Sequence, residues 1–276
     1  MDGRDQQLRW RSTLVQGRDA RYGVAGEGDP VVFVHGWGLS QRSYRAALHR
    51  LVRTGARVYA PALPGFGGTA PLPRAELSMV GYAKWLQAFL DEVEVPQPVT
   101  LIGHSFGGGV ALKTAHDHPR AVSRLVLVNS IGGSVWKADK AMRDRPIWDW
   151  GLHLSAGALS PRGLTRVVPV VAADAVSNAV QHPHVLWAVG RLARDANLEA
   201  ELAAVRRRRL PVFVLWGRND RVIPLASAEA LIGTSDDTEI QTVAGDHGWL
   251  IADPGLFAEV ITNVMGVAIP PEAVGQ

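Results

Sequence analysis

The sequence predicts an α/β fold in which a mostly parallel sheet is flanked by helices. Three observations lead to this prediction. Short apolar runs bounded by turn residues recur along the 276-residue chain, segments with apolar residues at helical spacing separate them, and 47% of all residues are hydrophobic. Strands that alternate with helices form parallel sheets buried on both faces, and such strands are almost continuously apolar. A chain of this length can bury a sizeable core.

Five apolar runs are the expected parallel strands, because each is rich in β-branched residues and is followed by turn residues. They occupy residues 31–36, 57–63, 99–105, 124–130 and 211–217. Nearer the N-terminus, two more runs flank Gly17. We expect these two to pair as an antiparallel hairpin at the edge of the sheet.

Five further segments have the apolar spacing of helices that cover a sheet. They occupy residues 41–53, 77–93, 106–118, 226–231 and 254–265. The first opens after Ser40, a favourable N-cap residue, and the third is expected to end before Pro119, which cannot continue a helix.

The stretch 132–206 interrupts this alternation. It shows helical patterns without a strand-like run between them, and it is rich in tryptophan: Trp136, Trp148, Trp150 and Trp187. We therefore expect an α-helical cap inserted between the two parts of one core, residues 1–131 and 207–276, and lying over the sheet.

Composition excludes several classes of function. The chain has no cysteine, so disulfides and thiol catalysis are excluded, and no run reaches the roughly 18–20 apolar residues that span a bilayer. The polar N-terminus does not read as a secretory signal, which favours a cytoplasmic protein. The net charge is only +3, and the one arginine cluster, 206–209, is typical of a solvated helix end. We expect no nucleic-acid partner and no cofactor. His182 and His184 lack a third ligand at recognisable spacing, so no metal site is expected either.

The stretch 101–109, "LIGHSFGGG", contains the motif Gly103-His104-Ser105-Phe106-Gly107. Gly-x-Ser-x-Gly alone is a weak signal, but here it follows an apolar strand and opens a helical pattern. That context is typical of a nucleophile elbow, a sharp strand-to-helix turn that presents the serine at the carboxyl edge of the sheet. Small neighbours accommodate the strained backbone, so Ser105 is the candidate nucleophile.

A serine hydroxyl needs a base to take its proton, and the base needs a carboxylate to orient it. His247 is expected on a loop at the same sheet edge, and Asp220 directly follows the run 211–217. The order Ser105, Asp220, His247 matches the order expected for this type of sheet. His104 adjoins the serine and is expected to support the turn, and Asp246 adjoins the base and is expected to be a surface charge.

The developing oxyanion needs hydrogen-bond donors. The backbone N–H of Phe106 is one candidate, and the loop "HGWG" after the run 31–36 supplies the other from Trp37, with Gly36 and Gly38 permitting a tight path.

Six blocks of the sequence resemble the α/β-hydrolase fold superfamily, in the family order and over most of the chain. They are "VVFVHGWGLS", "APALPGFGGT", "LIGHSFGGGVAL", "LVLVNS", "VLWGRNDRVIP" and "GDHGWLIADP". The resemblance implies Ser105 as nucleophile, His247 as general base, Asp220 as acid, Trp37 and Phe106 as oxyanion donors, and a helical cap. Ala62 stands where members often carry Asp, and Asp246 where they often carry Gly; neither departure removes a triad residue. A serine nucleophile disfavours the dehalogenase and epoxide-hydrolase branches.

The sequence therefore favours a serine hydrolase that cleaves an ester-like or other acyl bond of a small, largely apolar substrate. Gly36, Trp37, Phe106, Trp136 and Trp148 are the residues expected to contact that substrate. The same triad serves carbon–carbon bond hydrolases of ring-cleavage products, thioesterases and haloperoxidase-like perhydrolases, and fold alone does not choose among them. A non-catalytic ligand-binding protein on this scaffold is a further alternative.

Overall fold

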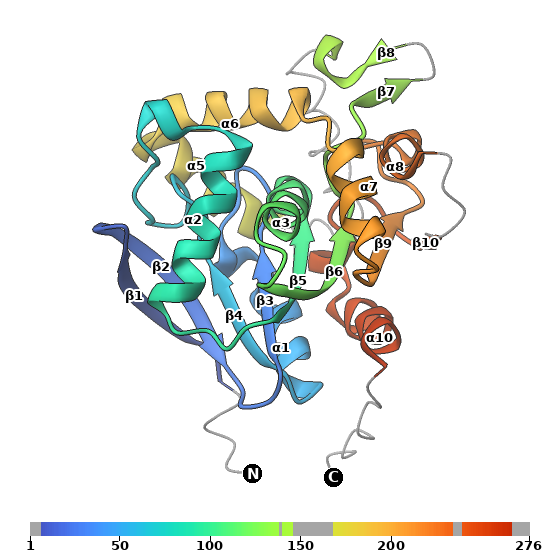
Figure 1. The fold of residues 1–276 in the computed structure, drawn as a ribbon. Helices are drawn as coiled ribbons and strands as arrows, with labels where there is room; N and C mark the ends of the chain where they lie inside the picture. The colour runs from blue at the N-terminus through green and yellow to red at the C-terminus, as the bar shows by residue number, and fades with distance from the viewer. Residues whose placement is uncertain (1–6, 138–139, 146–167, 234–238, 267–276) are drawn as a thin grey trace.

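The computed structural model describes residues 7–137, 140–145, 168–233 and 239–266. Within these ranges eight strands form one twisted sheet in the order β1-β2-β4-β3-β5-β6-β9-β10 (Figure 1). β2 runs antiparallel to both of its neighbours, and every other pair is parallel. The α/β class predicted from the sequence is confirmed, as is the N-terminal hairpin. The strands are β1 (Arg9–Val15), β2 (Arg18–Ala25), β3 (Pro30–Val34), β4 (Arg57–Pro61), β5 (Val99–His104), β6 (Val122–Val128), β9 (Val212–Gly217) and β10 (Ile240–Val243).

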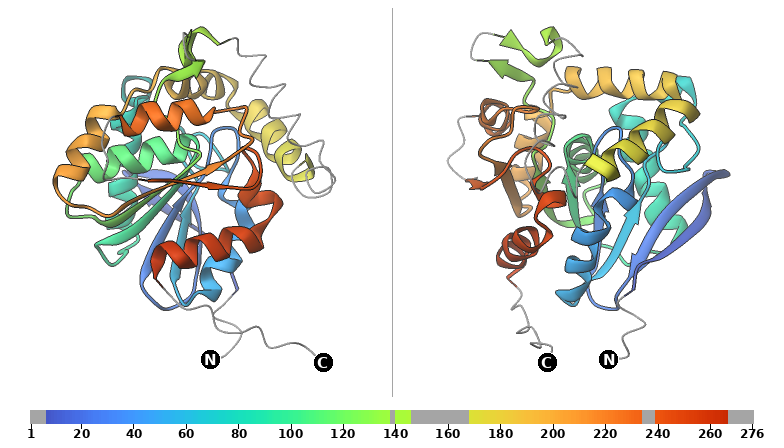
Figure 2. Two further views of the ribbon diagram at one scale, coloured as in Figure 1. Left: turned by 90° about the vertical axis from the view of Figure 1, so that its right-hand side faces the viewer. Right: turned by 180° about the vertical axis from the view of Figure 1, so that it is seen from behind.

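Helices cover both faces of the sheet (Figure 2). One face carries α1 and α10, and the other carries α2, α3, α7 and α8, each layer with its own buried apolar core. The α-helices are α1 (Arg45–Arg53), α2 (Met79–Glu92), α3 (Phe106–Asp117), α5 (Val168–Gln181), α6 (Pro183–Asp195), α7 (Glu199–Arg207), α8 (Leu225–Ile232), α9 (Trp249–Ala252) and α10 (Pro254–Met265). The described part of the chain also contains three short 3₁₀ turns, η1 (Gln41–Tyr44), η2 (Arg74–Glu76) and η3 (Met142–Asp144).

Two serines begin helical segments. Ser40 Oγ accepts the Arg42 N–H at 3.2 Å and opens η1, and Ser78 Oγ accepts the Gly81 N–H at 3.1 Å and opens α2. Each satisfies a backbone donor that has no partner inside the helix. The helix expected over 41–53 is divided, because its first turn is η1 and the α-helical part begins only at Arg45.

The segment between β6 and β9 is not purely helical, which corrects the sequence prediction. A short antiparallel hairpin, β7 (Val135–Lys137) with β8 (Lys140–Ala141), precedes its helices. Strands of two and three residues are too short to show an alternating pattern. β10 was missed for a related reason, since only four residues form it and half-exposed side chains interrupt its apolar pattern.

The helices of this segment have different surroundings. α6 crosses beyond the carboxyl ends of the central strands (Figure 1), and α5 packs on η1. α7 instead packs beside α3, with Leu202 and Val205 in the same core as the sheet. The boundaries of a cap at 132 and 206 stay a prediction.

α7 ends within the arginine cluster. Arg208 follows its last residue and donates to the carbonyl oxygens of His116 and Ala115 at 2.9 and 3.4 Å, near the end of α3. Cations at helix carboxyl ends interact favourably with the helix dipole. This arrangement favours the helix-end interpretation of the cluster.

Within the described ranges, no helix combines the length and apolar character needed to cross a bilayer.

Candidate active site

Ser105 occupies the sharp turn between β5 and α3 with φ 55° and ψ −120°. A side chain rarely adopts this left-handed conformation, and such strain concentrates at functional sites. The turn is possible because a Cβ at Gly103 would lie 2.4 Å from the Gly107 carbonyl oxygen, and one at Gly107 would lie 2.3 Å from that of Val34. Only glycine permits these approaches, so the two motif glycines hold the turn against the sheet.

Three side chains from separate loops meet at this turn. The Nε2 atom of His247 lies 3.0 Å from Ser105 Oγ, and its Nδ1 atom lies 2.8 Å from Asp220 Oδ2. Asp220 follows β9 and His247 follows β10, so the parallel strands bring both to one sheet edge. Because a carboxylate only accepts, His247 Nδ1 carries the proton and Nε2 is free to accept from the serine hydroxyl. The Asp220 and His247 side chains are buried, and Ser105 is half-buried.

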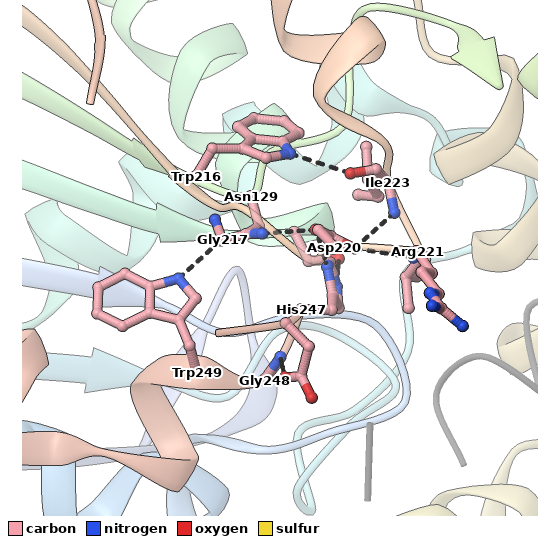
Figure 3. Close-up of polar contacts among 12 residues, drawn as sticks. Asn129, Trp216, Gly217, Asp220, Arg221, Ile223, His247, Gly248 and Trp249 are labelled. Atoms are coloured by element: carbon pink, nitrogen blue, oxygen red, sulfur yellow. Dashed lines mark hydrogen bonds and ion pairs between the residues drawn. The ribbon is translucent and has the colours of Figure 1, made fainter. Parts of the chain in front are cut away.

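The Asp220 carboxylate receives donors on both oxygens (Figure 3). Oδ2 accepts from His247 and from the side-chain amide of Asn129, the latter at 2.5 Å, and Oδ1 accepts the N–H groups of Val222 and Ile223 at 2.8 and 2.9 Å. A carboxylate accepts on both oxygens in this way when it is ionised. Its orientation is therefore set from several sides.

Asn129 is itself held in place. The Trp249 indole N–H donates to its Oδ1 atom at 2.8 Å, and the residue is fully buried directly after β6 (Figure 3). The amide nitrogen must then face Asp220. Asn129 therefore connects Trp249 of α9 to the Asp220 carboxylate.

The loop after β3 is fixed by a neutral histidine. His35 Nδ1 donates to the Gly36 carbonyl at 2.8 Å, and its Nε2 accepts the Leu63 N–H at 2.8 Å. Burial lowers the pKa of His35 to about 4, so the ring stays neutral at physiological pH. This holds Gly36 beside the elbow, where a Cβ on it would lie 3.2 Å from the Ser105 Cβ.

A second neutral histidine connects this loop to the candidate base, His247. The Gly36 N–H donates to Tyr44 Oη at 3.1 Å, the Tyr44 hydroxyl donates to His104 Nδ1 at 2.7 Å, and His104 Nε2 donates to the His247 carbonyl at 2.9 Å. Burial holds the pKa of His104 well below its usual 6.5 and raises that of Tyr44. His104 thus connects Tyr44 to the backbone of His247, and its expected role in supporting the turn stays a prediction.

Comparison with known proteins places the chain in a family. The model of the "Alpha/beta hydrolase family" matches residues 31–260. The chain belongs to the alpha/beta hydrolase family. A pimeloyl-[acyl-carrier protein] methyl ester esterase of Aromatoleum aromaticum is 34% identical, over 85% of this chain and 97% of that protein. A 2-hydroxy-6-oxo-2,4-heptadienoate hydrolase of Pseudomonas putida is 28% identical, over 87% and 90%. A solved serine hydrolase involved in carbazole degradation has the same fold, with a TM-score of 0.75, 23% identity and coverage of 94% and 99%.

In this member of the alpha/beta hydrolase family, the residues expected to contact substrate lie in different places. Trp37 is half-buried, and its indole N–H donates to the Leu186 carbonyl of α6 at 2.8 Å. The Phe106 ring is fully buried against Tyr82, so the Phe106 side chain is part of the core and is not placed to contact substrate. Trp136 lies on β7 under the guanidinium of Arg145, 5.4 Å from the ring centroid. Trp148 lies outside the described residues.

The two expected oxyanion donors stay a prediction, and each follows a residue that lies in or beside the turn. Phe106 is the first residue of α3, so its N–H has no acceptor within the helix, and Trp37 follows Gly36. Asp246 is half-buried, and its Oδ1 accepts the Gly248 N–H at 2.9 Å, so it caps the turn after His247 and is not a free surface charge. In the described part of the chain, no cluster of three or more His, Asp or Glu side chains is arranged to hold a metal ion.

Sequence reasoning missed several supporting residues of this family member: Tyr44, Asn129, Arg145 and Trp249. Asn129 had a usable signal, since it directly follows a strand at the same edge as Ser105 and Asp220. The others lie on helices or in a turn where nothing local distinguishes them.

Proposed function

We propose that the protein is a serine hydrolase that cleaves an ester-like or other acyl bond of a small, largely apolar substrate. The observation that carries the proposal is the continuous contact from Asp220 to His247 to Ser105, at 2.8 and 3.0 Å, with the serine in a strained turn at a helix start. This is the arrangement that activates a hydroxyl nucleophile.

The proposed reaction has two halves. Ser105 Oγ attacks the substrate carbonyl carbon while His247 Nε2 takes the hydroxyl proton, and the N–H groups of Phe106 and Trp37 donate to the resulting oxyanion. The tetrahedral intermediate collapses, and His247 returns the proton to the leaving alkoxide. Water then attacks the acyl-enzyme by the same route and releases the acid and Ser105.

The relative at 34% identity acts, by its name, on a methyl ester, which favours an ester as the bond cleaved. A second candidate is a carbon–carbon bond hydrolase, because the relative at 28% is named for a hydroxy-oxo-dienoate substrate. A half-buried Trp37 against α6 supports an apolar substrate for either reaction.

The test is hydrolysis of short p-nitrophenyl and methyl esters by the parent and by Ser105→Ala. We expect a loss of about 10⁴-fold or more in kcat, and labelling of the parent alone by a fluorophosphonate probe. Undiminished turnover by the variant would refute the assignment of the nucleophile. A parallel assay with vinylogous diketones separates the two candidates, and a folded parent that neither turns over nor labels would favour the binding-protein alternative.

A further inference from the structure

Arg145 is a buried cation in the segment between β6 and β9. It follows η3, its exposed fraction is 1%, and its guanidinium carbon lies over the Trp136 ring, 5.4 Å from the ring centroid. Its Nη1 atom donates to the Val222 carbonyl at 2.5 Å, and its Nη2 atom donates to the Arg221 carbonyl at 2.9 Å. A guanidinium fork thus grips two consecutive carbonyls of the loop that follows β9.

The same two peptide groups hold the candidate acid from their other side. The peptide that begins at the Arg221 carbonyl ends at the Val222 N–H, and the next one joins the Val222 carbonyl to the Ile223 N–H. Both N–H groups donate to Asp220 Oδ1, at 2.8 and 2.9 Å. Each peptide therefore accepts from Arg145 and donates to Asp220.

We propose that Arg145 is a positioning residue of the triad, acting on Asp220 through these two peptide groups. A cation on the carbonyl side polarises each peptide, which strengthens the hydrogen bond that its N–H makes to the carboxylate. The fork also fixes the plane of the loop, and so the direction in which Asp220 faces His247. Trp136 packs against this guanidinium, so in this proposal it supports Arg145 and does not contact substrate.

This inference rests on the proposed function of the triad. It predicts an effect on pH dependence, because a cation behind Asp220 opposes protonation of His247. Among the residues that the structure describes, the other titratable or charged groups around His247 are Asp220 on its Nδ1 side, the neutral His104 ring at a centroid distance of 4.9 Å, and the adjacent Asp246. Ser105 completes the surroundings on the Nε2 side. Only the Arg145 contribution is changed by substitutions at that position.

The experiment compares Arg145→Met, which removes the charge and the fork, with Arg145→Lys, which retains the charge alone. Arg143→Gln is the matched control, because this arginine lies on η3 but its side chain is 73% exposed. For Arg145→Met we expect kcat/KM for a p-nitrophenyl ester to fall about tenfold or more and the acidic limb of its pH profile to move to higher pH. Arg145→Lys should lose rate but keep the acidic limb near that of the parent.

A double-mutant cycle separates positioning from general support of the fold. In an Asp220→Asn background, Arg145→Met should lower kcat/KM by less than threefold, because its route to the reaction has been removed. The resonance of the His247 Nδ1 proton should also shift in Arg145→Met and not in Arg143→Gln. Equal losses in both backgrounds, with an unmoved acidic limb, would overturn the inference. If instead Ser105→Ala remained active, the proposed function itself would fail, and the proton resonance would still report on Arg145.

Discussion

The nucleophile and the acid of the candidate triad are held in place by different means. Ser105 is held by its own chain neighbours, since glycines two positions before and after it permit a turn that packs against β3 and the sheet. Asp220 is held by residues remote in sequence. Asn129 lies 91 positions away from it, and Arg145 donates to the carbonyls of Arg221 and Val222, which lie 76 and 77 positions from Arg145. The strained backbone at Ser105 therefore depends on a local sequence motif, whereas the buried Asp220 carboxylate depends on hydrogen-bond donors from distant parts of the chain.

The largest effect is expected from Gly107→Ala, which disturbs the turn that holds Ser105. Its new Cβ would lie 2.3 and 2.4 Å from two backbone oxygens of β3 and the following loop, which cannot move independently of the sheet. We expect a loss of at least about 3 kcal/mol in the free energy of unfolding, measured in urea. Gly17→Ala is the control, because nothing lies within 4 Å of that position and only its φ of 74° is unfavourable, a cost of about 1 kcal/mol. Equal losses would show that close packing at the elbow is unimportant.

Acid should lower the free energy of unfolding through the two buried neutral histidines near Ser105, His35 and His104. Above pH 6.5 both are uncharged in the folded and the unfolded chain. As pH falls from 6.5, the unfolded chain takes up protons that the folded chain refuses, because burial lowers the pKa of His35 to about 4 and that of His104 well below 6.5. The free energy of unfolding should therefore fall, by about 3 kcal/mol at pH 4 for His35 alone.

Urea unfolding between pH 7.5 and pH 4 measures this slope. The exposed His184→Gln variant should show the slope of the parent. A free energy of unfolding that does not change with pH over this range would mean that neither buried ring is kept neutral by the fold.

Asn129→Asp tests directly whether the distant donors of Asp220 matter for the reaction. The substitution keeps the shape but replaces a donor to Asp220 with a second negative charge. We expect kcat/KM to fall about 10–100-fold and its acidic limb to move to higher pH, because added negative charge favours protonated His247. Asn263→Asp, at an exposed position of α10, should leave both unchanged. Parent-like kinetics in Asn129→Asp would show that Asp220 does not depend on its remote donor.

A smaller effect is expected where α5 docks next to the loop after β3. Asp174 accepts the N–H and hydroxyl of Ser40 at 2.9 and 2.8 Å and also the hydroxyl of Ser43. Asp174→Ala should cost about 1–2 kcal/mol and raise amide hydrogen exchange in α5 and η1 without altering the pH profile. Asp195→Ala, at the exposed end of α6, is the control. A changed acidic limb in Asp174→Ala would mean that this docking contact belongs to the positioning of the triad.

Much of the fold and the candidate site could be predicted from sequence because their causes are local. A buried parallel strand needs an unbroken apolar run, so β3, β4, β5, β6 and β9 were each visible in the sequence. Ser105 and Asp220 were also visible, since each follows one of these strands, and His247 was visible in the block "GDHGWLIADP" that resembles the family. The hairpin of β7 and β8 and the edge strand β10 were missed, because two to four residues carry too little pattern.

The sequence alone was enough to predict where the main strands lie along the chain, the turn around Ser105 and the loops that share one sheet edge with it. Hydrophobic periodicity and backbone sterics act over a few neighbouring residues, so their effects can be recognised in the sequence. The orientation of Asp220 was visible only in the folded chain, because Asn129 donates to its carboxylate directly and Trp249 orients Asn129. Arg145 contacts the two peptide groups whose N–H groups donate to Asp220. A buried carboxylate needs hydrogen-bond donors close to it in three dimensions, and the spacing of residues along the chain does not indicate which donors tertiary packing brings there.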